Sequence, residues 1–131
     1  MSAKRPKELS DNNAIQIVLK SHPEWRTGWE RGTLPDEVIG EDGQPMSPRM
    51  HIAIHTIVER QLATDDPKGI VAIAHELEQA GMSSHEARHA IGQAVSGQLW
   101  AMSKERRAFN SAQYFAELRR IIESHKQGGM Q

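Results

Sequence analysis

The sequence contains no cysteine. This absence excludes disulfide bonds, zinc sites built from thiolates and iron–sulfur clusters. Long hydrophobic runs are also missing, because no apolar stretch approaches the length of a membrane-spanning helix. The first residues lack the apolar segment of a secretion signal. From these absences we expect a soluble protein located in the cytoplasm, without a membrane partner.

An excess of charge of either sign is lacking too. The chain has 16 Lys and Arg against 17 Asp and Glu, which gives a formal net charge of −1. This balance argues against nucleic acid or an acidic membrane surface as a partner. The composition does not indicate which protein, if any, is a partner. A chain of 131 residues is long enough for one domain with a real hydrophobic core.

Helical periodicity accounts for most of the apolar residues. We expect a disordered tail over residues 1–10, a single helical domain over 11–125 and a flexible tail over 126–131. Apolar spacing predicts five helices and one shorter turn, around residues 14–19, 23–29, 48–62, 67–81, 84–102 and 109–122. Residues 32–47 have no helical period and no strand is predicted there. The predicted fold class is all-α: a compact bundle of four to five helices with a long Gly/Pro-containing loop.

Capping residues mark where these helices begin. Ser47 reads as an N-cap followed by Pro48 at the first helical position. Asp66 followed by Pro67 has the same form. Ser83 and Glu86 have the spacing of a capping box, in which each side chain accepts the other residue's backbone N–H.

Two histidines and a glutamate share the apolar face of the helix predicted over 48–62. At about 100° per residue, His51, His55 and Glu59 lie on the same side as Val58 and Leu62. A buried imidazole or carboxylate without a partner costs free energy, so these groups need partners. The helix predicted over 84–102 repeats the His-x3-His spacing at His85 and His89. If the two helices are antiparallel neighbours, four imidazoles converge, and a metal ion satisfies them all.

The predicted ligands are therefore His51, His55, His85 and His89, with Glu59 either a direct ligand or an acceptor for an imidazole N–H. Imidazole donors without thiolates favour one zinc or iron(II) ion. Four protein ligands would make the site structural, which we prefer, whereas three ligands and a water would permit catalysis. Whether the protein is an enzyme stays open. Three further histidines are left out of the set, as a loop or cap residue, a surface residue and a tail residue: His22, His75 and His125.

Two interpretations without a metal remain open. In the first, the histidines form a neutral hydrogen-bonded network with Glu59, Glu86 or backbone carbonyls, or a cluster that responds to protons. In the second, the chain is an interaction module that binds a protein or nucleic acid through the region of Trp25 and Trp29 or through the basic residues 104–107.

The second histidine pair also matches the zinc-protease pattern HExxH, in which the glutamate activates a metal-bound water. Three features argue against a protease. The motif lies in the first turn of its predicted helix, Arg88 occupies a position that is usually apolar, and no strand is predicted to align a peptide. Glu86 is better explained as part of the capping box. A di-iron site is disfavoured because only Glu86-x2-His89 has the required form.

Several short motifs occur in an order and at a spacing that resemble a known family. They are His22-Pro23-Glu24-Trp25, Ser47-Pro48-x2-His51-x3-His55, Gln61-Leu62-Ala63-Thr64-Asp65-Asp66-Pro67-x-Gly69-Ile70, His85-x3-His89 and Gln98-Leu99-Trp100. Over residues 14–122 the chain resembles an uncharacterised family of small bacterial helical proteins, a domain of unknown function with paired His-x3-His helices. The resemblance implies a compact helical domain and again the four histidines. It implies no activity.

Overall fold

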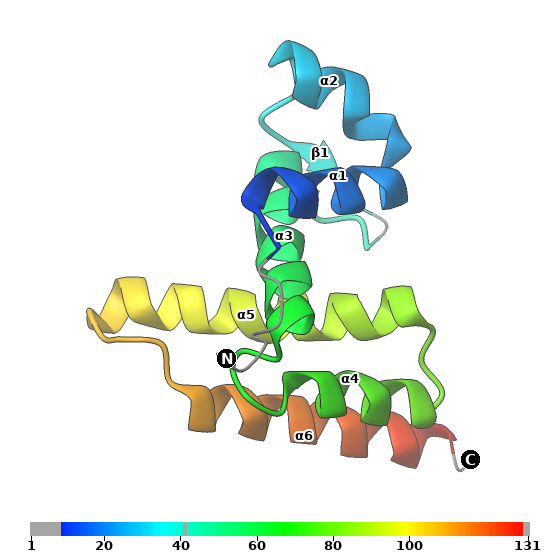
Figure 1. Ribbon diagram of the computed structural model, residues 1–131, viewed down its shortest axis with the longest axis vertical. Coiled ribbons are helices and arrows are strands. Elements are labelled where there is room, and N and C mark those ends of the chain that lie inside the picture. Colours follow the sequence, from blue (N-terminus) through cyan, green and yellow to red (C-terminus); the bar gives the residue numbers. More distant parts are fainter. Residues whose placement is uncertain (1–8, 41, 130–131) are drawn as a thin grey trace, which may run out of the picture. The chain divides into compact units, whose positions relative to one another are not determined.

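The computed structural model describes residues 9–40 and 42–129. Within these ranges helices dominate, which confirms the all-α class (Figure 1). In chain order the elements are α1 (Asp11–Ser21), the short 3-10 helix η1 (Pro23–Trp25), α2 (Arg26–Arg31), β1 (Val38–Ile39), β2 (Pro45–Met46), α3 (Pro48–Thr64), α4 (Ile70–Gln79), α5 (Ser84–Glu105) and α6 (Ser111–Gly129). The described part has six α-helices rather than four to five, because Arg26–Arg31 forms a helix of its own.

The chain divides into two compact units, which meet in sequence between Thr64 and Asp65. Unit 1 is the part up to Thr64 and unit 2 is the part from Asp65 onward. The single domain predicted over residues 11–125 stays a prediction. Of the predicted tail over 1–10, residues 1–8 lie outside the described residues. Helix α6 continues to Gly129 and so includes the first four residues of the predicted C-terminal tail.

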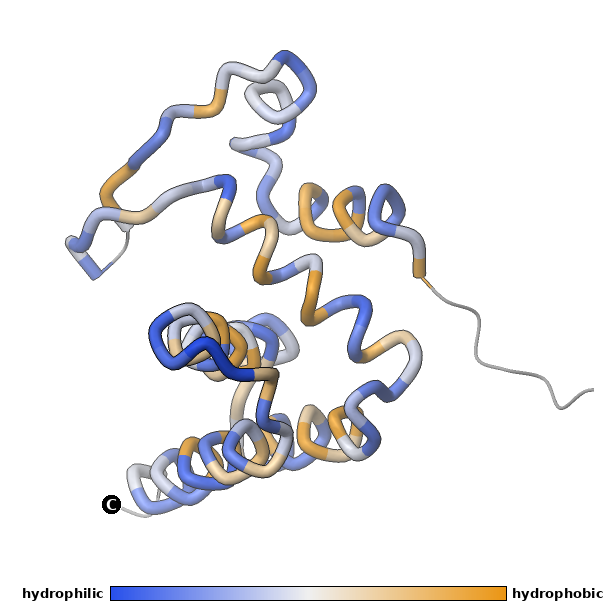
Figure 2. Tube along the Cα trace, turned by 90° about the vertical axis from the view of Figure 1, so that its left-hand side faces the viewer, coloured by the Kyte–Doolittle hydropathy of each residue, from blue (hydrophilic) through white to orange (hydrophobic). Residues whose placement is uncertain are grey.

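Unit 1 is organised by the packing of α1 against α3, which lie across each other in Figure 1. Figure 2 shows hydrophobic and hydrophilic residues alternating along these helices, as expected of amphipathic helices. The buried cluster consists of Val18, Leu19, Leu34 and Ile52. Trp25 and Trp29 are partly buried and pack against this cluster.

The loop over residues 32–47 contains a small hairpin. Strands β1 and β2 pair antiparallel, with Val38 opposite Met46. The Gly40 N–H donates to the Gln44 carbonyl oxygen at 2.8 Å, and Gly43 takes a φ of +78° in the turn. The prediction that this loop lacks strands is therefore wrong. Each strand has only two residues, too few to show an alternating pattern in the sequence.

Unit 2 consists of α4, α5 and α6, each of which packs against the other two. Their contacts bury large apolar side chains, with Tyr114 as the aromatic member: Ile70, Ile73, Leu77, Ile91, Val95, Tyr114, Leu118 and Ile122. In the parts of the chain that the structure describes, no helix combines the length and the apolar character needed to cross a membrane. The cytoplasmic location stays a prediction.

The start of α4 differs from the prediction. Its first residue is Ile70, not Pro67, and its N-cap is Gly69, which makes no side-chain cap bond. The carboxylate that bonds the start of the helix belongs to Asp65 rather than Asp66. Asp65 Oδ1 accepts the backbone N–H groups of Gly69 at 3.1 Å and Val71 at 3.0 Å. These bonds, Val71 first, lower the pKa of Asp65 below its ordinary value of 3.8. Spacing alone chose the wrong aspartate, because Asp65 reaches the helix from a left-handed backbone conformation with φ of 52°.

The starts of α3 and α5 agree with the prediction. Ser47 Oγ accepts the Met50 N–H at 3.2 Å. At α5, Ser83 Oγ accepts the Glu86 N–H and Glu86 Oε1 accepts the Ser83 N–H, both at 3.0 Å. The capping box is thus complete. These reciprocal bonds satisfy backbone donors that the first helical turn otherwise leaves without intrahelical partners.

We expect Ser83→Ala to lower the free energy of unfolding by about 1 kcal/mol, because an N-cap hydroxyl is lost. Ser96→Ala, at an exposed position inside α5, is the matched control and should be neutral or slightly stabilising. Urea unfolding followed by circular dichroism measures both. Equal effects of the two substitutions would contradict the capping role.

The second prediction concerns the acid side of the stability curve. Because the folded-state pKa of Asp65 is lowered, its contribution is present above its ordinary pKa and is lost as pH falls through the lowered value. Asp65→Asn tolerates the left-handed conformation but removes the charge. We expect a lower unfolding midpoint at pH 7 and a difference from wild type that shrinks below about pH 4. Asp66→Asn is the control, and a difference independent of pH would contradict the assignment.

Candidate metal centre

Helix α3 brings the first predicted histidine pair together. His51 and His55 are one turn apart, and their ring centroids lie 4.4 Å from each other. His51 is half-buried and His55 is buried, with 6% of its surface exposed. Ile52 and Val58, which belong to the same stretch of α3, are completely buried. The pair therefore lies among core residues, as its position on the apolar face predicted.

A third imidazole in unit 1 joins this pair. The ring centroid of His22 lies 4.9 Å from that of His51 and 5.7 Å from that of His55. Each of the three residues offers one ring nitrogen, and these nitrogens lie within 4.8 Å of one another. His22 follows α1, and its backbone N–H donates to the Leu19 carbonyl oxygen at 3.2 Å. Since Leu19 is buried in the contact with α3, the packing of α1 positions His22.

Sequence reasoning left His22 out of the ligand set. The available signal was the position of His22, three residues after Leu19 on an amphipathic helix that has to pack its apolar face somewhere. To place His22 beside His51 and His55, one must also know that α1 packs on α3. The periodicity of a single helix does not show which helix it packs against.

The three nitrogens could hold a metal ion. Neutral imidazole nitrogens bind zinc and iron at about 2.0–2.1 Å, so the nitrogens of a tetrahedral site are about 3.3 Å apart. In this structure the three nitrogens lie within 4.8 Å of one another, so they would move closer together around an ion. Three protein ligands leave a further coordination position for water or another ligand.

Two residues of η1 also lie beside His22. The ring of Trp25 stacks on His22 with a centroid distance of 4.8 Å and an interplanar angle of 19°. The same indole meets His51 edge-on at 5.3 Å and 77°. Glu24 Oε1 lies 3.5 Å from His22 Nδ1. Both neighbours come from η1, which follows His22 directly.

Glu59 lies one turn beyond His55 on α3 and is half-buried. Its predicted roles, as a direct ligand or as an acceptor for an imidazole N–H, stay predictions.

The second histidine pair lies on α5 in unit 2. The ring centroids of His85 and His89 are 4.5 Å apart, and both side chains are exposed. The convergence of this pair with His51 and His55 involves both units and stays a prediction of the sequence.

Glu86, the glutamate of the HExxH pattern, serves as a helix cap. The backbone N–H of Ser83 donates to its carboxylate, and this bond, followed by one from the Ser83 hydroxyl, lowers the pKa of Glu86. The capping interpretation of Glu86 is thereby confirmed.

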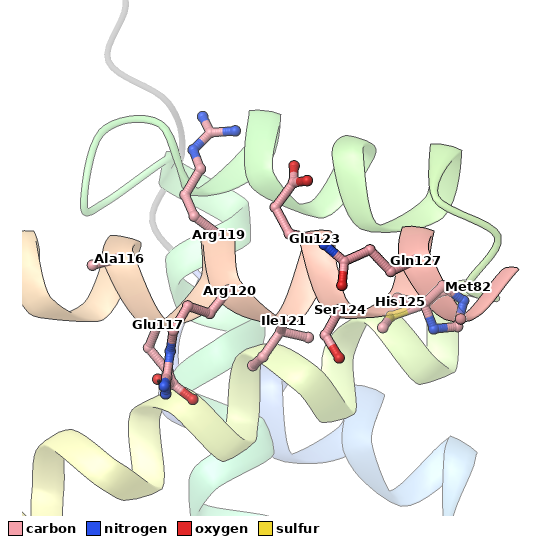
Figure 3. A pocket seen from close by; sticks show the side chains of 11 residues that line it. Met82, Ala116, Glu117, Arg119, Arg120, Ile121, Glu123, Ser124, His125 and Gln127 are labelled. Carbon is pink, nitrogen blue, oxygen red and sulfur yellow. Dashed lines mark hydrogen bonds and ion pairs between the residues drawn. The ribbon is translucent and has the colours of Figure 1, made fainter. Parts of the chain in front are cut away.

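The remaining histidines lie in unit 2. His75 is largely exposed on α4, in agreement with the prediction of a surface residue, and its Nδ1 is 3.9 Å from Glu78 Oε2. His125 is half-buried on α6. It lines a surface pocket together with Met82 and side chains along one side of α6 (Figure 3).

The charged side chains of this pocket are paired locally. Arg119 Nη1 is 2.8 Å from Glu76 Oε1, and Arg120 forms an ion pair with Glu117. These pairs balance charge within unit 2 and do not indicate a particular ligand. The imidazole cluster of unit 1 is therefore the stronger candidate site.

Comparison with known proteins places the chain in a family. No curated protein and no solved structure matches the chain significantly. A protein family described as a domain of unknown function, DUF1841, matches residues 2–120. This match covers most of the 131 residues and both histidine pairs. The chain therefore belongs to the DUF1841 family, a domain of unknown function.

Proposed function

We propose that this protein binds one transition-metal ion and that His22, His51 and His55 are its ligands in unit 1. The observation that carries the proposal is the convergence of three ring nitrogens within 4.8 Å. These imidazoles come from two separate segments, so adjacency along one helix does not explain the cluster. A metal ion provides a common partner for the three nitrogens.

The donor set favours zinc or iron(II). Both ions accept imidazole nitrogen, and the chain has no thiolate that would favour softer metals. With three ligands from unit 1, one position remains for a water, for Glu59 or for an imidazole of the second pair. A fourth protein ligand makes the site structural, whereas a water leaves it open to catalysis. His85 and His89 are proposed as additional ligands on the sequence pattern alone.

Metal analysis of untagged protein purified without chelator tests the proposal. We expect about one equivalent of zinc or iron per chain, and removal of the metal should lower the melting temperature by several degrees. A ligand present at a hundred times its Kd stabilises the folded state by about 2.7 kcal/mol. In His55→Ala, metal content and the effect of chelator on melting should both fall, whereas His75→Ala should behave like wild type.

Single substitutions at His85 and His89 test whether the second pair contributes. Loss of metal in either variant would support a four-ligand structural site. Retention of metal in both would leave a three-histidine centre in unit 1. A wild-type protein that holds less than a tenth of an equivalent of any transition metal, and binds none when titrated, would contradict the proposal and favour a metal-free interaction module.

Trp25 provides an optical test of where the metal binds. Its indole contacts both His22 and His51, so a paramagnetic ion held by these imidazoles should quench its emission. In the variant Trp29→Phe, Trp100→Phe, which keeps Trp25, we expect saturable quenching by Cu²⁺ or Ni²⁺ with a stoichiometry of one.

The matched control for this titration carries His22→Ala and His51→Ala in the same variant, so that Trp25 remains and two of the proposed ligands are lost. Its emission should be quenched much less at the same metal concentration. Equal quenching of the two variants would contradict binding at His22 and His51.

A further inference from the structure

We propose that Glu24 is a positioning residue of the metal site, which orients the imidazole of His22. This inference rests on the proposed function. In metal sites a ligating histidine commonly donates its second ring N–H to a carboxylate, which sets the tautomer and the ring orientation. Glu24 supplies a carboxylate on the Nδ1 side of His22, with Oε1 at 3.5 Å.

The backbone of η1 explains how Glu24 reaches this position. Pro23 opens the turn, and the Trp25 N–H donates back to the His22 carbonyl oxygen at 3.0 Å. The turn therefore folds the two residues after Pro23 back over His22. Trp25 covers the face of the imidazole and Glu24 lies beside its Nδ1. Trp25 and Glu24 therefore restrict the rotation of the His22 ring, one at its face and the other beside Nδ1.

The distance and the exposures fit an orienting contact. At 3.5 Å the two atoms are within ion-pair range but further apart than in a good N–H···O hydrogen bond, so the proposed bond requires the Glu24 side chain to move closer. The side chain of His22 is only 12% exposed, whereas that of Glu24 is 58% exposed. The carboxylate therefore remains hydrated outside while the imidazole lies inside. With Nδ1–H directed to Glu24, Nε2 is the nitrogen that His22 presents to the metal.

Glu24 also supplies charge of the appropriate sign. Three neutral imidazoles leave a divalent ion with its full charge of +2. A carboxylate hydrogen-bonded to one of them makes that imidazole a more basic ligand. The sequence predicts that residues 22–25 consist of a loop or cap residue, His22, and the beginning of a short turn. In the proposed site the same four residues supply a ligand, its orienting carboxylate and its aromatic cover.

Cobalt titration of the full-length protein tests this role. Co²⁺ alone is added to metal-free protein in competition with a chelating dye, and the visible absorption bands of the bound ion are recorded. We expect Glu24→Ala to weaken Co²⁺ binding by about 10- to 100-fold, the usual effect of removing such an acceptor. Glu24→Gln, which keeps an oxygen acceptor, should fall between Glu24→Ala and wild type and change the absorption bands less.

The matched control is Glu30→Gln, at an exposed glutamate of the same unit whose partner is Arg26. It should bind Co²⁺ as wild type does. The metal-free melting temperature should be the same in all four proteins. Affinity of Glu24→Ala within twofold of wild type would overturn the inference, as would a loss of affinity accompanied by an equal loss of metal-free stability. Failure of the proposed function looks different, because wild type itself would then bind no Co²⁺.

Discussion

The packing of α1 against α3 is the interaction on which the candidate site depends. Leu19 and Ile52 are completely buried in this contact, and each is close in sequence to a member of the cluster, His22 or His51. Burial of a leucine or isoleucine side chain contributes about 1.5–3 kcal/mol. This gain is as large as the cost of desolvating an imperfectly bonded polar group, about 1–3 kcal/mol. The apolar contact between α1 and α3 is therefore large enough to offset such a cost for an imidazole beside it.

Capping rules predicted the helix starts that depend on hydrogen bonds between residues close in sequence. The α3 start at Ser47 and the capping box at Ser83 follow from side chains that bond backbone groups three residues away. The same rules failed at Asp65, where the cap acts across six residues from a left-handed conformation. They also failed at His22, because its neighbours His51 and His55 are about thirty residues away and belong to a different helix. The sequence predicted the helix on which each of these residues lies or ends. It did not predict which distant residues they contact, because that depends on how the chain packs.

The two units of the chain differ in where their charged and polar side chains lie. In unit 2 the charged side chains at the surface of α6 pair with near neighbours, such as Glu76 with Arg119, and the core beneath is apolar. In unit 1 the imidazoles of His22, His51 and His55 lie close together, and the carboxylate of Glu24 lies exposed beside His22. Nitrogen donors inside and a carboxylate outside are the arrangement expected around a cation that prefers imidazole to oxygen.

The capping box at the start of α5 bears on how short catalytic patterns are interpreted. His85-Glu86-x2-His89 matches the sequence pattern of a peptidase centre. In this chain, however, the Glu86 carboxylate accepts the backbone N–H of Ser83 and caps the helix. A peptidase needs that carboxylate beside a water, in the interior of a helix whose first turn lies well upstream. In this chain the serine three positions ahead of the glutamate therefore accounts for the glutamate of the pattern without any hydrolytic role.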